Sequence, residues 1–167
     1  NRGAVVSELT NQTVLDCYEV REMLDGLAAR LCCDRITRVQ LRELSEMVQR
    51  MRNLTAGGRQ EKSAWLDRQF HLRLIEIASN SLLSRLAEQH WAMGKMVTGK
   101  KGAAERTRDE HAAILKAIES GDEAEAERAA RAHIVAARRW IEQSLANGTF
   151  EPRWIVSEPG GSVSSEP

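Results

Sequence analysis

The chain has 167 residues, a length that suits a single domain, and 42% of them are hydrophobic, enough for a substantial core. Lysine plus arginine and aspartate plus glutamate number 24 each, so the formal net charge is zero. A domain that grips DNA by itself usually carries a basic excess, and this balance argues against direct nucleic-acid binding by these residues.

Cysteine usage and hydropathy indicate the compartment. The cysteines are Cys17, Cys32 and Cys33, and an odd count with two of them adjacent is a poor disulfide framework. We therefore expect buried, reduced thiols. No stretch resembles a signal peptide, and no apolar run approaches the roughly 20 residues that a membrane span needs. These features predict a cytoplasmic protein without a membrane partner.

Composition and periodicity predict an all-α fold. Alanine, leucine, arginine and glutamate dominate, and all three prolines lie at or after Pro152. Apolar residues recur at spacings of three and four along six segments. The expected helices run from Thr10 or Thr13 to Asp34, from a cap at Thr37 to Gly57, and over 61–78, 81–97, 104–119 and 123–146. Short connections between them predict an antiparallel bundle of about six helices.

The two ends of the chain differ from this central part. Residues 1–9 read as an extended lead-in, and 10–148 form the helical domain. Residues 149–167 are rich in proline, glycine and serine, so we expect this tail to be largely disordered.

The four histidines lie on the apolar stripes of their helices. His71, His111 and His133 each have apolar residues three, four or seven positions away, and His90 is placed similarly. Asp67 precedes His71 by four residues and shares its face. An unpaired carboxylate on a core stripe is costly, and either a metal ion or a paired arginine would remove that cost.

Two interpretations of these residues remain open on spacing alone. Asp67, His71, His111 and His133 could hold a divalent ion such as Zn, Ni, Mn or Fe, which imidazole and carboxylate ligands suit. Such an ion would retain open positions and bind a small carboxylate. Alternatively, the histidines are core residues bonded to backbone or to carboxylates. By spacing, His90 could replace any of the three histidines.

Arg21 lies at the edge of the apolar stripe of the first helix. Buried, its guanidinium could clamp a ligand carboxylate with two hydrogen bonds. The alternative, which spacing favours, is an ordinary surface ion pair with Glu22 or Asp25.

Several segments resemble the FCD domain, the effector domain of the FadR branch of GntR-type transcription regulators. They are, in chain order, 19–31 (EVREMLDGLAARL), 67–74 (DRQFHLRL), 78–80 (ASN), 110–118 (EHAAILKAI), 121–122 (GD) and 132–134 (AHI). Together they extend over about residues 10–146. The helix count resembles the smaller, VanR-like six-helix group.

The resemblance implies a metal-dependent sensor. In metal-binding members of the family the ligands fall on Asp67, His71, His111 and His133, which makes Zn, Ni or Mn the expected cofactor. His90 then lines the cavity, and Arg21 lies near the effector, a small organic acid.

The resemblance also implies partners. Residues 1–6 are similar to the last strand of a winged helix, so we expect a fragment of a regulator that binds DNA only through an absent N-terminal winged-helix domain. A homodimer is expected, because operator half-sites mirror a two-fold protein.

Two rival functions are alternatives to the sensor. A metal-dependent hydrolase would need a general base, and Glu110 is the obvious candidate. It directly precedes His111, however, and so points about 100° away from the site. We therefore expect that the chain is not an enzyme. A metal-free helical interaction module with core histidines is the second rival.

Overall fold

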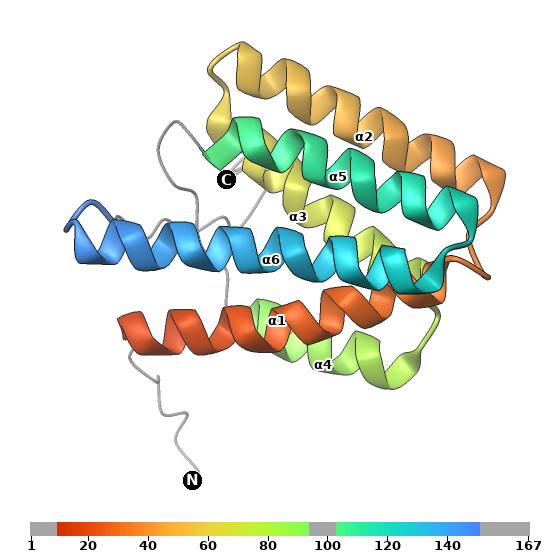
Figure 1. The fold of residues 1–167 in the computed structure, drawn as a ribbon, viewed down its shortest axis with the longest axis horizontal. Coiled ribbons are helices and arrows are strands. Elements are labelled where there is room, and N and C mark those ends of the chain that lie inside the picture. The colour runs from red at the N-terminus through yellow and green to blue at the C-terminus, as the bar shows by residue number, and fades with distance from the viewer. Residues whose placement is uncertain (1–9, 94–102, 151–167) are drawn as a thin grey trace, which may run out of the picture.

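The computed structural model describes residues 10–93 and 103–150, and the regular secondary structure within them is entirely helical (Figure 1). Its helices are α1 (Asn11–Cys32), α2 (Arg38–Ala56), α3 (Gln60–Ile77), α4 (Ser81–Met93), α5 (Ala103–Ser120) and α6 (Glu123–Ala146). The all-α prediction and the six-helix count are confirmed, with most helix ends within two residues of the expected ones. The expected extension of the fourth helix to Val97, the lead-in and most of the tail lie outside the described residues.

Helix starts follow the capping chemistry of the sequence. The Thr37 side chain accepts a hydrogen bond from the Gln40 backbone, and the Gln40 side chain accepts one from the Thr37 backbone, which makes a complete capping box. Asp122 accepts from the Glu125 backbone at the start of α6. After α5 the chain turns at Gly121, whose φ of 71° is accessible to glycine at little cost.

Consecutive helices run back and forth, so that neighbours are largely antiparallel (Figure 1). The largest helix–helix contact joins α1 to α6, and α5 packs on both α6 and α2. On the far side in Figure 1, α3 packs against α2 and α1, and α4 packs against α1 and α3. The middle of the bundle is therefore enclosed by α1, α3, α5 and α6.

Small residues let α1 and α6 approach closely. Ala28 and Ala29 of α1 and Ala126 of α6 are fully buried. At Gly26 a Cβ atom would stand 2.6 Å from Cγ of Arg131, so the absence of a side chain on α1 leaves room for an arginine of α6. Larger side chains fill the core around the α3 stripe, with Phe70 completely buried.

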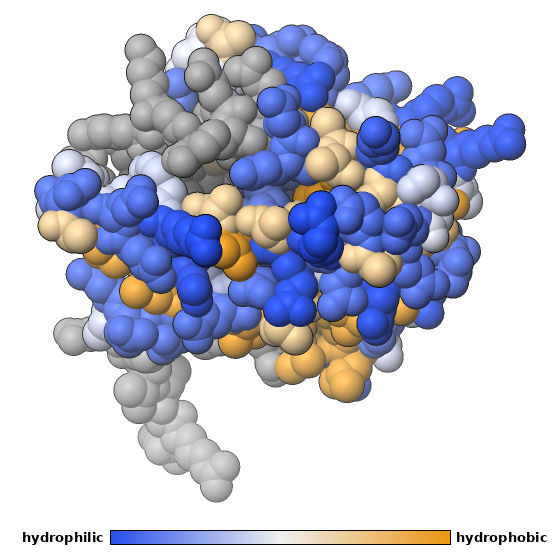
Figure 2. Space-filling view, in the orientation of Figure 1, coloured by the Kyte–Doolittle hydropathy of each residue, from blue (hydrophilic) through white to orange (hydrophobic). Residues whose placement is uncertain are grey.

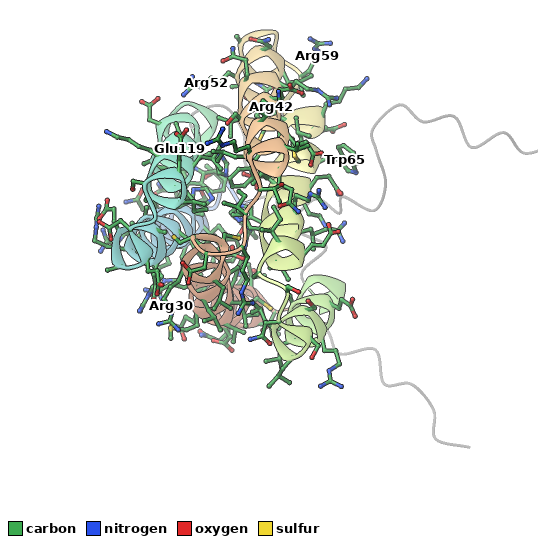
Figure 3. All side chains as sticks on the ribbon, turned by 90° about the vertical axis from the view of Figure 1, so that its right-hand side faces the viewer. Arg30, Arg42, Arg52, Arg59, Trp65 and Glu119 are labelled. Carbon is green, nitrogen blue, oxygen red and sulfur yellow. The ribbon has the colours of Figure 1, made fainter. Side chains whose placement is uncertain are left out.

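On the face of the molecule shown in Figure 2, the described residues are mainly polar. Within the described ranges, no helix combines the length and the apolar character needed to cross a bilayer. The exposed large hydrophobic residues of α1 and α4 are Val20, Met23, Leu82 and Leu86. Trp65, expected on the apolar stripe of the third helix, is only half-buried and lies at the outer edge of α3 when the bundle is viewed end-on (Figure 3).

Candidate metal centre

Four side chains from three helices converge in the middle of the bundle. Asp67 and His71 lie one turn apart on α3, His111 comes from α5, and His133 comes from α6. One donor atom from each lies within 4.8 Å of the others. The three histidines are at most 4% exposed, whereas the Asp67 side chain keeps 28% of its surface accessible. The predicted four-residue cluster is therefore assembled, and Asp67 is its most exposed member.

The distances between the donor atoms can be compared with those around a single shared ion. Asp67 Oδ1 lies 3.1 Å from His111 Nε2 and 3.9 Å from His71 Nε2. His71 Nε2 lies 3.5 Å from His111 Nε2 and 3.2 Å from His133 Nε2. Donors about 2.1 Å from one ion stand about 3.0 Å apart at right angles and about 3.4 Å apart at tetrahedral angles. Three of the four separations lie close to these values, and the 3.9 Å between Asp67 and His71 requires a wider angle, so the donor set could hold one transition-metal ion.

Aromatic packing fixes the imidazole rings. Phe70 meets the His71 ring edge to face with centroids 5.5 Å apart, and its centroid lies 4.6 Å from that of His111. The rings of His71 and His133 are stacked, with an interplanar angle of 17°. The buried Phe70 ring therefore packs against two histidines of the cluster, His71 and His111.

The electrostatics of the cluster favour an ionised Asp67 and neutral imidazoles at His71 and His133. Burial lowers the pKa of His133 well below its ordinary value, with help from the charges of His111 and His71. Burial and the charge of Arg21 likewise lower the pKa of His71. Burial opposes ionisation of Asp67, but its hydrogen bond with His111 and the neighbouring histidines outweigh burial and hold its pKa below the usual range. These are the protonation states that a metal ion requires of its ligands.

Two carboxylates that the sequence interpretation missed stand behind the histidines. Glu110 Oε2 lies 2.9 Å from His133 Nδ1, the ring nitrogen remote from the cluster. Asp25 Oδ2 lies 3.2 Å from His71 Nδ1, although the N–H direction there falls short of a straight hydrogen bond. Only the three-dimensional approach of α5 to α6 and of α1 to α3 brings them there. The sequence signal was limited to Glu110 facing away from His111 and to Asp25 lying four residues after Arg21.

Arg21 is buried, and its Nε donates to Asp25 Oδ2 at 3.0 Å. The expected ion pair with Asp25 therefore exists, but its expected place at the surface was wrong, because α1 turns this face toward α3. The guanidinium carbon also lies 5.6 Å from the centroid of the Tyr18 ring. The side chain of His90 lies outside the described residues, so its place in the cavity stays a prediction.

Comparisons with known proteins agree with this architecture. A family model described as the FCD domain matches residues 16–136. HTH-type transcriptional regulator LutR of Bacillus subtilis is 28% identical over 136 residues, which cover 75% of this chain and 61% of that protein. The chain thus spans less than two thirds of this curated relative.

Solved structures share the fold. GntR of Streptococcus agalactiae aligns with a TM-score of 0.69 at 24% identity, covering 81% of this chain and 62% of that one. E. coli McbR/YncC aligns with a TM-score of 0.71 at 16% identity, covering 84% and 73%. The match of the family model over most of the chain, with the six-helix fold and the quoted motifs in their expected order, shows that this chain belongs to the FCD domain family.

Proposed function

We propose that this FCD domain is a metal-dependent sensor of a small organic acid within a GntR-family transcription regulator. The observation that carries the proposal is the convergence of three buried imidazole nitrogens and one partly exposed carboxylate at coordination spacing. Zn, Ni or Mn is the proposed ion, because each accepts nitrogen and oxygen donors together. Asp67, His71, His111 and His133 would hold it.

Charge is the reason to propose a carboxylate as the effector. A divalent ion held by one carboxylate and three neutral imidazoles keeps a charge of about +1 and can accept further oxygen ligands. The partly exposed Asp67 side of the cluster is where such a ligand would enter. Arg21 is the proposed second contact, because its charge already reaches the cluster and lowers the pKa of both His71 and His133. We also propose that His90 lines the effector cavity.

The response to the effector is proposed to be a change in DNA binding. LutR, the curated relative, is an HTH-type transcriptional regulator. The zero net charge of this chain favours DNA contact through a separate winged-helix domain, to which residues 1–9 would connect. The effector must bind two arrangements of the regulator unequally, because only differential affinity shifts an equilibrium. Such a regulator acts on DNA in the cytoplasm, where free cysteines persist.

A homodimer is proposed as the working unit. Two-fold symmetric operators require two copies of the DNA-reading domain. The exposed apolar side chains Met23 of α1 and Leu86 of α4 belong to adjacent helices and supply surface that a second copy would cover. Light scattering tests this proposal. We expect a dimer mass for the native chain and a shift toward monomer in Leu86→Glu.

The family also bears on the rival functions. FCD domains belong to transcription regulators and are not an enzyme family, which confirms the expectation that this chain is not an enzyme. Glu110, the candidate base of a hydrolase, lies against His133 Nδ1 on the side away from the cluster. A metal-free interaction module predicts that chelators leave stability unchanged.

Calorimetry with a panel of mono-, di- and tricarboxylates tests the sensor proposal. The metal-loaded protein should bind at least one of them, and binding should disappear after chelation and in His133→Ala. Glu127→Ala, which alters another residue of α6 outside the cluster, should leave binding unchanged. Equal carboxylate binding with and without metal would contradict the proposal.

A further inference from the structure

The contact between His133 and Glu110 determines which nitrogen of His133 carries a proton. An ionised carboxylate can only accept hydrogen bonds, so the Nδ1 atom 2.9 Å from Glu110 Oε2 must be the donor. In the neutral imidazole the other nitrogen, Nε2, then has a free lone pair. That lone pair points into the cluster, toward His71 Nε2 at 3.2 Å.

Asp25 stands behind His71, although its contact with Nδ1 is less well aligned than that of Glu110 with His133. Its Oδ2 lies 3.2 Å from His71 Nδ1 and, on the other side, 3.0 Å from Arg21 Nε. The side chains of Arg21 and Asp25 are 9% and 3% exposed, so the arginine balances the charge of a carboxylate that would otherwise be costly to bury. Asp25 can thus remain ionised beside a neutral His71.

Without these carboxylates, nothing in the cluster favours the inward lone pairs. Two neutral imidazoles with Nε2 atoms 3.2 Å apart would be more stable if one donated its proton to the other. A pair whose outer nitrogens are both protonated gives up that hydrogen bond. A carboxylate behind each ring favours protonation of the outer nitrogens over a direct hydrogen bond between the two Nε2 atoms, an arrangement that suits a cation between them.

We propose that Glu110 and Asp25 are positioning residues, which hold His133 and His71 as Nδ1–H tautomers so that both Nε2 lone pairs face the metal. In this account Arg21 neutralises Asp25. The inference rests on the proposed metal-dependent function, but it concerns a property of the metal-free protein as well, and so the two can fail separately.

Glu110→Ala is the sharpest variant, because the Glu110 side chain is 30% exposed and meets His133 at Nδ1, on the side away from the cluster. Long-range ¹H–¹⁵N NMR of the chelator-treated protein reports the tautomer of each histidine directly. We expect Nδ1–H for His133 and His71 in the native protein. In Glu110→Ala we expect His133 to gain a substantial Nε2–H population while His71 keeps its tautomer. Zinc affinity, measured by competition with a chromophoric chelator, should fall by about 10- to 100-fold.

Two further variants complete the test. Glu110→Gln retains a carbonyl acceptor and should keep the Nδ1–H tautomer, with a smaller loss of zinc affinity. Asp109→Ala removes the neighbouring carboxylate, whose side chain is 92% exposed, and should change neither readout.

If His133 loses its Nδ1–H tautomer in Glu110→Ala but keeps it in Glu110→Gln and Asp109→Ala, the inference is supported even if zinc does not bind. In that case only the proposed function fails. Zinc binding with the same affinity and the same His133 tautomer in Glu110→Ala would overturn the inference and leave the proposed function standing. An Nε2–H tautomer of His133 in the native protein would also overturn it.

Discussion

Asp67 of α3 and His111 of α5 meet across the bundle, with Oδ1 and Nε2 3.1 Å apart. The contact joins helices that are distant in the chain, and the pKa of Asp67 stays below its usual range even though burial opposes ionisation. Asp67→Asn keeps the shape of the side chain and removes the charge. Because a neutral amide is a poor metal ligand, we expect zinc affinity to fall by at least about tenfold.

Competition with a chromophoric chelator measures this change. Asp109→Asn, on the exposed face of α5, is the matched control and should retain native affinity. Native affinity in Asp67→Asn would remove Asp67 from the ligand set.

Phe70 is expected to be a main support of both the core and the cluster. It is 0% exposed and contacts the rings of His71 and His111. Phe70→Ala should lower the free energy of unfolding by about 3–5 kcal/mol, because it removes buried surface and leaves a cavity. Urea denaturation with chelator present measures this loss apart from any metal effect. Leu82→Ala, at a side chain 57% exposed, should cost less than about 0.5 kcal/mol. A similar cost for the two variants would contradict the packing described for Phe70.

The pH dependence of the metal-free protein follows from the lowered pKa values of His71 and His133. Between the folded pKa and the unfolded value of about 6.5, the unfolded chain binds more protons than the folded one. Stability should therefore be fully present above about pH 7 and decrease as pH falls below about 6.5. The contributions of Asp67 and Asp25, whose pKa values are also lowered, should be lost only below about pH 4.

Thermal unfolding in chelator from pH 8 to pH 5 measures this profile. His133→Gln removes one of the titrating groups and should flatten the decrease between pH 6.5 and 5.5. A protein that became more stable on acidification through this interval would contradict the lowered histidine pKa values.

Gly26 tests the close approach of α1 and α6. Alanine normally stabilises a helix interior by about 1 kcal/mol relative to glycine. Here the added Cβ would stand 2.6 Å from Arg131 Cγ, and moving that side chain disturbs its hydrogen bonds to Glu22 at 2.8 and 2.9 Å. We expect Gly26→Ala to lower the free energy of unfolding by about 1 kcal/mol, because overpacking of about 1–3 kcal/mol exceeds the gain.

A double-mutant cycle separates the two effects. In an Arg131→Ala background the two closest contacts are gone and only Glu127 Cγ remains near, at 3.3 Å, so Gly26→Ala should lose its cost and become stabilising by up to about 1 kcal/mol. If Gly26→Ala had the same effect in both backgrounds, the contact between Gly26 and Arg131 would carry no energetic weight.

Sequence reasoning succeeded where periodicity alone decides the outcome. Helical spacing placed His71, His111 and His133 on inward faces, and the bundle brings those faces together. The cap at Thr37 was readable because the residues that form a capping box are local in the chain.

The contacts of the Glu110 and Asp25 carboxylates with the histidines could not be predicted from the sequence, because each contact depends on how two helices pack. Glu110 was interpreted only through its direction relative to His111 on the same helix, yet its partner is His133 of α6. The Arg21–Asp25 pair is local and was anticipated, but its burial depends on α3 packing over that face of α1. Periodicity shows which face of a helix a residue lies on, whereas tertiary packing determines which atoms its side chain contacts.

Metal content is the measurement that tests the account most directly. Elemental analysis of the untagged protein, purified without chelators or metal resin, should find about one equivalent of Zn, Ni or Mn per chain, and His111→Ala should lose it. No metal in the native protein, together with a melting temperature indifferent to added Zn, Ni or Mn, would contradict the four-ligand site and the sensor mechanism built on it.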